Sequence, residues 1–238
     1  MTPRPSTLVL ATLTGSLAFS LGCTAPERVD PTGTMTADEQ RAMTPDEALA
    51  ELKAGNERYT SGESTRYEWL TQARQTAGGQ YPHSVVLSCL DSRVPVEAIF
   101  DQGIGDIFVG RVAGNFENTD MLGSMEFGTK LAGSKLIVVL GHTSCGAVKG
   151  TIAGAEMGNL TETLENIEPA VERTPAGSMG RTTEDPDYVA RVVEENVRLT
   201  VRDIRERSEV IDDLVRSGDL KVVGAVYDLE SGGVAWLD

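Results

Sequence analysis

One stretch decides the fold of this chain: LIVVLGHTSCGAVKG, residues 136–150. Its first five residues are apolar and rich in β-branched side chains, which is typical of a buried strand. Helical spacing resumes at Cys145 and predicts a helix over 145–155. A strand that runs directly into a helix is the repeating unit of a parallel sheet. The stretch therefore predicts an α/β fold with polar residues at the end of a strand.

The rest of the chain repeats this alternation of apolar strands and amphipathic helices. Further strands are predicted at 85–87 and 107–109, a C-terminal hairpin at 221–227 and 234–237, and helices at 65–77, 94–100, 119–132 and 186–217. Glycine and serine between the last two runs favour the hairpin turn. We expect a central, mostly parallel sheet flanked by helices, with the C-terminal strands at the sheet edge.

Three segments divide the chain. Residues 1–22 carry an early arginine and an apolar run too short to span a bilayer comfortably, which is typical of a secretory signal peptide. Residues 23–43 have almost no large apolar side chains, so we expect a flexible linker there. Residues 44–238 form the globular domain, which opens with a predicted capping box at Thr44 and Glu47.

Composition narrows the classes of partner. The 238 residues carry a formal net charge of −15, which argues against binding nucleic acid or an anionic membrane through charge. The three cysteines are too few and too widely spaced for a disulfide framework, so each needs its own explanation. A chain of this length is expected to hold one domain plus appendages.

Side chains with metal-binding chemistry follow two of the predicted strands directly. The first strand runs into Cys89, Asp91 and Arg93, and the third into His142 and Cys145. The carboxyl ends of parallel strands are where open α/β sheets bind ligands. Two sulfurs and an imidazole make a three-ligand zinc set that leaves a fourth position open. Taken alone, a cysteine after a strand is more often a buried packing residue, and an isolated His-x-x-Cys motif is weak evidence for a metal. Together, the two groups of residues favour one zinc ion per chain.

Two motifs resemble those of the β-class carbonic anhydrases, namely Cys-x-Asp-Ser-Arg at 89–93 and His-x-x-Cys at 142–145. The similarity extends over 106–115 and 136–149, and more weakly to the C-terminus. It therefore covers most of the globular domain. The resemblance implies reversible, zinc-dependent hydration of carbon dioxide to bicarbonate and a proton.

The resemblance also assigns roles to five residues. Cys89, His142 and Cys145 bind zinc, and water takes the fourth position. Asp91 accepts a hydrogen bond from that water and orients it. Arg93 pairs with Asp91 and keeps the carboxylate off the metal. A two-pronged guanidinium pair suits this task, because it neutralises the carboxylate and fixes its direction.

Residues around the substrate follow from the same resemblance. Gln80 stands where one subtype has a substrate-contacting glutamine, and Phe108 matches an apolar pocket wall. Phe127 replaces a tyrosine of that subtype, so the tyrosine's hydroxyl is missing. Val86 stands where the other subtype has a tryptophan that forms an inhibitory bicarbonate site, so this switch is expected to be absent. Without a functional role, Gln80 would be an ordinary loop residue and Phe127 would pack in an interface or in the core. His83 is interpreted as a loop residue, with a proton shuttle as the alternative.

Assembly and rival functions complete the expectations for the domain. Family members are dimers or multiples of dimers in which N-terminal helices embrace the partner and the pocket lies at the dimer interface, and the resemblance implies the same here. One alternative function is hydrolysis of carbonyl sulfide or carbon disulfide on the same scaffold. Another is a non-catalytic zinc- or bicarbonate-binding protein, against which the retained Asp91 and Arg93 argue.

The end of the signal-like run resembles a bacterial lipoprotein signal, because Gly22 directly precedes Cys23. In such signals, cleavage leaves the cysteine as an acylated first residue. The resemblance implies an exported lipoprotein of the periplasm or cell envelope, held to a membrane only through lipid at Cys23. Ser20 departs from the leucine that such signals prefer at that place. Ordinary cleavage nearby and an uncleaved N-terminal anchor are the alternatives.

Overall fold

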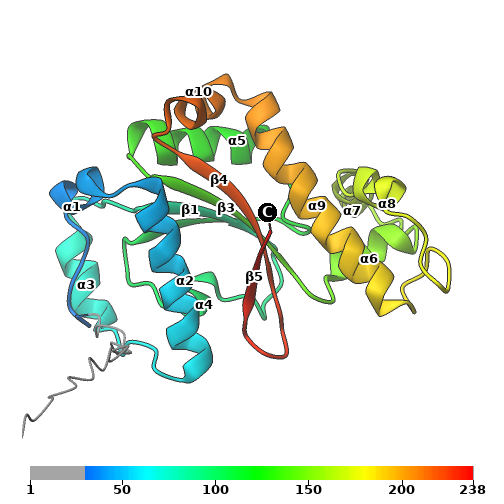
Figure 1. Ribbon diagram of the computed structural model, residues 1–238, viewed down its shortest axis with the longest axis horizontal. Coiled ribbons are helices and arrows are strands. Elements are labelled where there is room, and N and C mark those ends of the chain that lie inside the picture. The colour runs from blue at the N-terminus through cyan, green and yellow to red at the C-terminus, as the bar shows by residue number, and fades with distance from the viewer. Residues whose placement is uncertain (1–29, 238) are drawn as a thin grey trace, which may run out of the picture.

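The computed structural model describes residues 30–237, which form a five-stranded sheet with helices on both faces (Figure 1). The strand order is β2-β1-β3-β4-β5, with β1 to β4 parallel and β5 antiparallel to β4. The strands are β1 (Ser84–Ser88), β2 (Ile107–Arg111), β3 (Leu136–His142), β4 (Lys221–Tyr227) and β5 (Val234–Leu237). The predicted α/β class, the mostly parallel sheet and the C-terminal strands at its edge are confirmed.

Helices bury both faces of the sheet (Figure 1). The covering helices are α2 (Pro45–Ser61) and α4 (Val96–Ile99) on one face, and α5 (Thr119–Glu126), α9 (Pro186–Arg207) and α10 (Glu209–Ser217) on the other. Val86 and Val138 face the helices α2 and α4, whereas Val85 and Ile137 face α5, α9 and α10. Because β1 and β3 are covered on both faces, their sequences are continuously apolar and do not alternate.

The parallel register brings the two metal-binding motifs to one edge of the sheet. β1 and β3 are direct neighbours, so Cys89 after β1 and His142 at the end of β3 lie at adjacent carboxyl ends. Cys145 is the N-cap residue of α6 (Gly146–Ile152). Ser144 just before it has a left-handed φ of 55°, which non-glycine residues rarely adopt. This tight turn returns the chain so that Cys145 stays close to His142.

The structure differs from the predicted linker over its second half. Residues 37–42 form helix α1 (Ala37–Ala42), with a capping box at its N-terminus. The buried Gln40 side chain donates hydrogen bonds to the carbonyl oxygens of Pro82 and Ala132 at 2.7 and 2.8 Å. Amino-acid composition does not predict this helix, because α1 is attached to the domain by hydrogen bonds from a polar side chain and not by burial of apolar residues. Cys23 and the rest of the predicted linker up to residue 29 lie outside the described residues.

Several helices also differ from their predicted bounds. The helix expected over 186–217 is divided at Ser208, whose extended backbone ends α9 and whose hydroxyl accepts the Ile211 N–H to cap α10. The pattern over 119–132 becomes α5 followed by a short π-helix. The remaining elements are α3 (Trp69–Thr76), η1 (Phe127–Leu131), α7 (Asn159–Glu165) and α8 (Glu168–Arg173). Of these, α7 and α8 have no counterpart in the sequence-based expectations.

Candidate metal centre

Cys89, His142 and Cys145 lie together at the carboxyl edge of the sheet. Their candidate ligand atoms are all within 4.8 Å of one another, and the two sulfurs are 3.9 Å apart. All three side chains are buried, and neither cysteine forms a disulfide within the described chain. The three predicted ligands, which come from two separate motifs, therefore form one compact cluster.

Hydrogen bonding sets the orientation of the His142 ring. Nδ1 lies 2.9 Å from the Thr143 carbonyl oxygen and donates to it, which leaves the lone pair on Nε2. Within residues 30–237, this Nε2 is a buried polar atom without a hydrogen-bond partner. An unpartnered buried nitrogen is costly unless something else binds it. A metal ion beside the two sulfurs would satisfy it.

The distances and the donor atoms fit zinc. Two sulfurs bound at about 2.3 Å to one tetrahedral zinc ion are about 3.8 Å apart. The measured separation of 3.9 Å agrees with that value. Thiolate sulfur and imidazole nitrogen are donors that zinc prefers, and three protein ligands leave the fourth position of a catalytic site to water.

The two sulfurs control each other's ionisation. The hydrogen-bonding contact between the two sulfurs lowers the pKa of Cys89, and the same contact, together with burial, raises the pKa of Cys145. The backbone N–H of Gly114 also donates to Cys89 Sγ, at 3.4 Å. A divalent cation held by Cys89 and Cys145 would ionise both thiols, because coordination favours the thiolate form.

Asp91 and Arg93 form a two-pronged ion pair beside the ligand cluster. Arg93 Nε and Nη2 donate to Asp91 Oδ1 and Oδ2 at 2.9 and 2.7 Å, and the Arg93 backbone N–H adds a bond of 2.9 Å. These Arg93 hydrogen bonds hold the pKa of the Asp91 carboxyl well below its usual range. Asp91 Oδ2 lies 3.8 Å from His142 Nε2. The ionised carboxylate thus reaches the edge of the cluster while Arg93 balances its charge.

Arg111 braces the same loop, although the sequence analysis did not single it out. Its Nε donates to the Cys89 carbonyl oxygen at 2.9 Å, and its Nη2 donates to the Asp91 carbonyl oxygen at 2.5 Å. These bonds restrain the backbone between a candidate ligand and the carboxylate that points at it. In the sequence, Arg111 falls within the 106–115 stretch that resembles the family. This resemblance does not predict which atoms Arg111 contacts.

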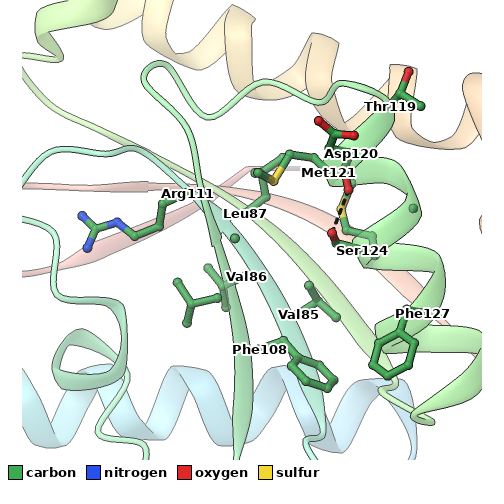
Figure 2. Close-up of a pocket in the computed structure, with 14 residues that line it drawn as sticks. Val85, Val86, Leu87, Phe108, Arg111, Thr119, Asp120, Met121, Ser124 and Phe127 are labelled. Atoms are coloured by element: carbon green, nitrogen blue, oxygen red, sulfur yellow. Dashed lines mark hydrogen bonds between the residues drawn. The ribbon is translucent and has the colours of Figure 1, made fainter.

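Phe108 and Phe127 line a groove of about 800 Å³ beside the edge strand β2 (Figure 2). Their ring centroids are 6.2 Å apart in an edge-to-face arrangement. The Phe127 side chain is 53% exposed, and Gln80 is exposed in the loop before β1. The three candidate metal ligands are not among the residues that line this groove. Within one chain, the predicted pocket residues and the metal ligands are therefore not brought together.

His83 lies in the loop directly before β1, as its interpretation as a loop residue predicts. Its side chain is buried, with Nδ1 2.7 Å from Ser84 Oγ and Nε2 2.8 Å from Gln102 Oε1. Burial lowers the pKa of His83, so the ring is neutral near pH 7. It precedes β1, at the opposite end of that strand from Cys89. A proton shuttle at this position finds no support in the geometry.

Comparisons with known proteins match this arrangement. The family model described as carbonic anhydrase matches residues 84–234, which include both motifs. A similar curated protein is carbonic anhydrase 2 of Mycobacterium tuberculosis, 39% identical over 186 residues that cover 76% of this chain and 87% of the relative.

Solved structures show the same fold. The β-carbonic anhydrase CafA of Aspergillus fumigatus matches with a TM-score of 0.64 and 26% identity over 81% of this chain and 90% of its own. One of two tetrameric β-carbonic anhydrases of Sordaria macrospora matches with a TM-score of 0.61 and 23% identity over 69% of this chain and 84% of its own. With the family match over most of the domain and the Cys-His-Cys cluster in place, the chain belongs to the β-class carbonic anhydrases.

Proposed function

We propose that this chain is a zinc enzyme that reversibly hydrates carbon dioxide to bicarbonate and a proton. The observation that carries the proposal is the buried Cys89, His142 and Cys145 cluster at the strand ends, with the Asp91–Arg93 pair beside it. Zinc at a three-ligand site supplies a nucleophile near neutral pH by acidifying a bound water, as is known for carbonic anhydrases with three histidine ligands.

The protein's own residues orient the reaction. Asp91 is placed to accept a hydrogen bond from the nucleophilic water, which directs the water's lone pair towards the substrate. Arg93 occupies both carboxylate oxygens and so prevents Asp91 from becoming a fourth ligand. The hydrogen bond from His142 Nδ1 to the Thr143 carbonyl oxygen keeps the tautomer that binds metal through Nε2. Two thiolates neutralise the charge of a divalent ion, so this orientation compensates for weaker acidification.

The test is stopped-flow hydration of carbon dioxide by the purified protein, before chelation, after chelation and after zinc is restored. We expect activity that disappears with the metal and returns with it. Hydrolysis of carbonyl sulfide and carbon disulfide is measured in parallel, because these linear molecules require the same nucleophile. Hydrolysis of either one without carbon dioxide hydration, or zinc binding without any turnover, would contradict the proposal.

We also propose that the protein assembles as a dimer or a multiple of dimers. β2 is an edge strand, and the groove beside it is apolar at Phe108 and Phe127. Trp69 and Leu70 on α3 are 51% and 65% exposed, although both are large and apolar. Exposed apolar surface of this kind marks interfaces. A second copy that covers β2 and the N-terminal helices would bring the pocket residues and the metal ligands together, which one chain alone does not do. Analytical ultracentrifugation measures the number of chains in the assembly.

Bicarbonate is not expected to inactivate the enzyme cooperatively. Val86, three residues before Cys89, is fully buried in the core, so this position offers no aromatic side chain for a second bicarbonate site. Initial hydration rates, measured against bicarbonate at several pH values, should fall only gradually, as product inhibition requires. A steep, cooperative loss of activity as pH falls, sharpened by bicarbonate, would show that such a switch exists by another route.

We propose that the protein is exported and carries lipid at Cys23, at the end of the signal-like run. Within residues 30–237, no helix is long and apolar enough to cross a membrane. The described chain already packs on the domain shortly after Asp30 through α1. The seven residues that follow Cys23, up to Asp30, span at most about 25 Å when extended, so the lipid would hold the domain close to the membrane surface.

Replacing Cys23 should separate anchoring from catalysis. We expect the native protein in the membrane fraction and Cys23→Ser in the soluble exported fraction, because the acyl chains supply the membrane affinity. The hydration activity of the two forms should be equal. Fractionation and the intact mass of the N-terminal peptide provide the measurement. A wholly soluble native protein with unmodified Cys23 would leave an ordinary secreted enzyme.

A further inference from the structure

The loop after β2 places a backbone donor against a candidate metal ligand. The Gly114 N–H donates to Cys89 Sγ at 3.4 Å, and the bond is buried. A hydrogen bond to a thiolate withdraws charge that the sulfur would otherwise give to the metal. The position of Gly114 therefore affects how strongly a cation bound by Cys89 polarises water.

Gly114 reaches the sulfur in a backbone conformation that favours glycine. Its φ is 88°, and a Cβ atom at this position would lie 2.4 Å from Ile167 Cδ1. Ile167 is fully buried next to α8, so the loop that carries Gly114 is packed between Cys89 and the segment that joins α7 to α8. Glycine has no side chain with which to hold this position, and its backbone is the most flexible of all residues. Something else must keep its N–H directed at Cys89.

Asn196 provides this restraint from inside α9. Its side chain is 3% exposed, and Nδ2 donates to the Gly114 carbonyl oxygen at 2.8 Å. The neighbouring Asn115 also has a positive φ, of 45°, and within residues 30–237 its buried Nδ2 has no hydrogen-bond partner. The turn is therefore linked through Asn196 to a long helix that packs on the sheet.

We propose that Asn196 is a positioning residue for the metal centre, which holds Gly114 so that its N–H stays bonded to the Cys89 sulfur. The inference rests on the proposed zinc site and extends it to a residue that contacts neither metal nor substrate. A buried asparagine inside a helix is unfavourable unless its amide is satisfied. Its partner here is the residue that donates to the ligand.

The experiment uses Asn196→Leu and Asn196→Ala in the full-length protein, since both remove the amide donor and the second adds no bulk. Cobalt(II) replaces zinc, and the near-ultraviolet sulfur-to-cobalt charge-transfer band is recorded. We expect the band to move to longer wavelength, because a thiolate without its hydrogen bond gives up charge more readily. Zinc affinity, measured by chelator competition, should fall about tenfold, because the Cys89 sulfur is no longer held in place and this loss of positioning outweighs the sulfur's stronger charge donation.

Asn56→Leu is the matched control. Asn56 is also buried in a helix, and its Nδ2 donates to the carbonyl oxygens of Ile99 and Gly232 at 3.1 and 3.0 Å, none of which adjoins a metal ligand. This variant should lose thermal stability and keep the wild-type band.

Three results would overturn the inference and assign Asn196 to the fold alone. They are an unchanged band in both Asn196 variants, an equal band shift in the Asn56→Leu control, and failure of both Asn196 variants to fold. A wild-type protein that binds neither zinc nor cobalt is a different result, because it would refute the zinc site and this inference with it.

Discussion

Cys145→Ala should lose its zinc and its hydration activity together. The variant leaves only Cys89 and His142 as protein ligands, and Cys145 sits within the 4.8 Å cluster. Loss of a hydrogen-bond partner of a metal ligand costs about 10–100-fold in affinity, and loss of the ligand itself should cost more. Metal analysis of gel-filtered protein and stopped-flow hydration measure the two effects. Cys145 is buried, so the smaller alanine also costs about 1 kcal/mol of stability.

Cys23→Ser is the control for this experiment, because it removes a thiol that lies outside the described domain. It should keep one zinc ion per chain and wild-type hydration rates. Undiminished zinc in Cys145→Ala would remove Cys145 from the ligand set. A wild-type protein without zinc would contradict the metal centre as a whole.

Arg93→Ala should keep its zinc and lose most of its hydration activity. Arg93 holds both Asp91 oxygens, and Asp91 Oδ2 already lies 3.8 Å from His142 Nε2. Without the guanidinium, the carboxylate is free to move onto the metal and take the position of the nucleophilic water. We expect a fall in turnover of about 100-fold, the scale on which misplacing a reactive group by about 1 Å lowers rates.

Arg216→Ala is the matched control, because Arg216 is an exposed arginine that pairs with Asp212 and Asp213 on α10. Exposed pairs of this kind contribute about 0–1 kcal/mol, so neither zinc content nor activity should change. Arg93→Lys should recover little of the lost activity, since lysine cannot form the two-pronged pair. Near-normal hydration rates in Arg93→Ala, with zinc still bound, would contradict the role given to the pair.

The amino-acid sequence is sufficient to predict the sheet and the ligand set. The bounds of β1, β2 and β3 lie within two residues of the predicted runs, and the hairpin of β4 and β5 agrees with its prediction. A strand buried on both faces must be continuously apolar, so its own residues mark it. Cys89, His142 and Cys145 could be identified for a related reason. Cys89 directly follows β1, His142 ends β3, and Cys145 follows after a short turn, and parallel strands bring their carboxyl ends together.

Only the tertiary structure decided which polar groups hold these elements in place. Gln40 anchors α1 through the carbonyl oxygens of Pro82 and Ala132, Arg111 braces the Cys89 loop, and Asn196 holds Gly114. Each contact joins a side chain to a backbone atom far away in the sequence. Every residue type has a backbone carbonyl oxygen, so the identity of the accepting residue does not reveal such a bond in the sequence. Apolar periodicity, in contrast, is a property of the helix or strand itself and can be read from its own residues.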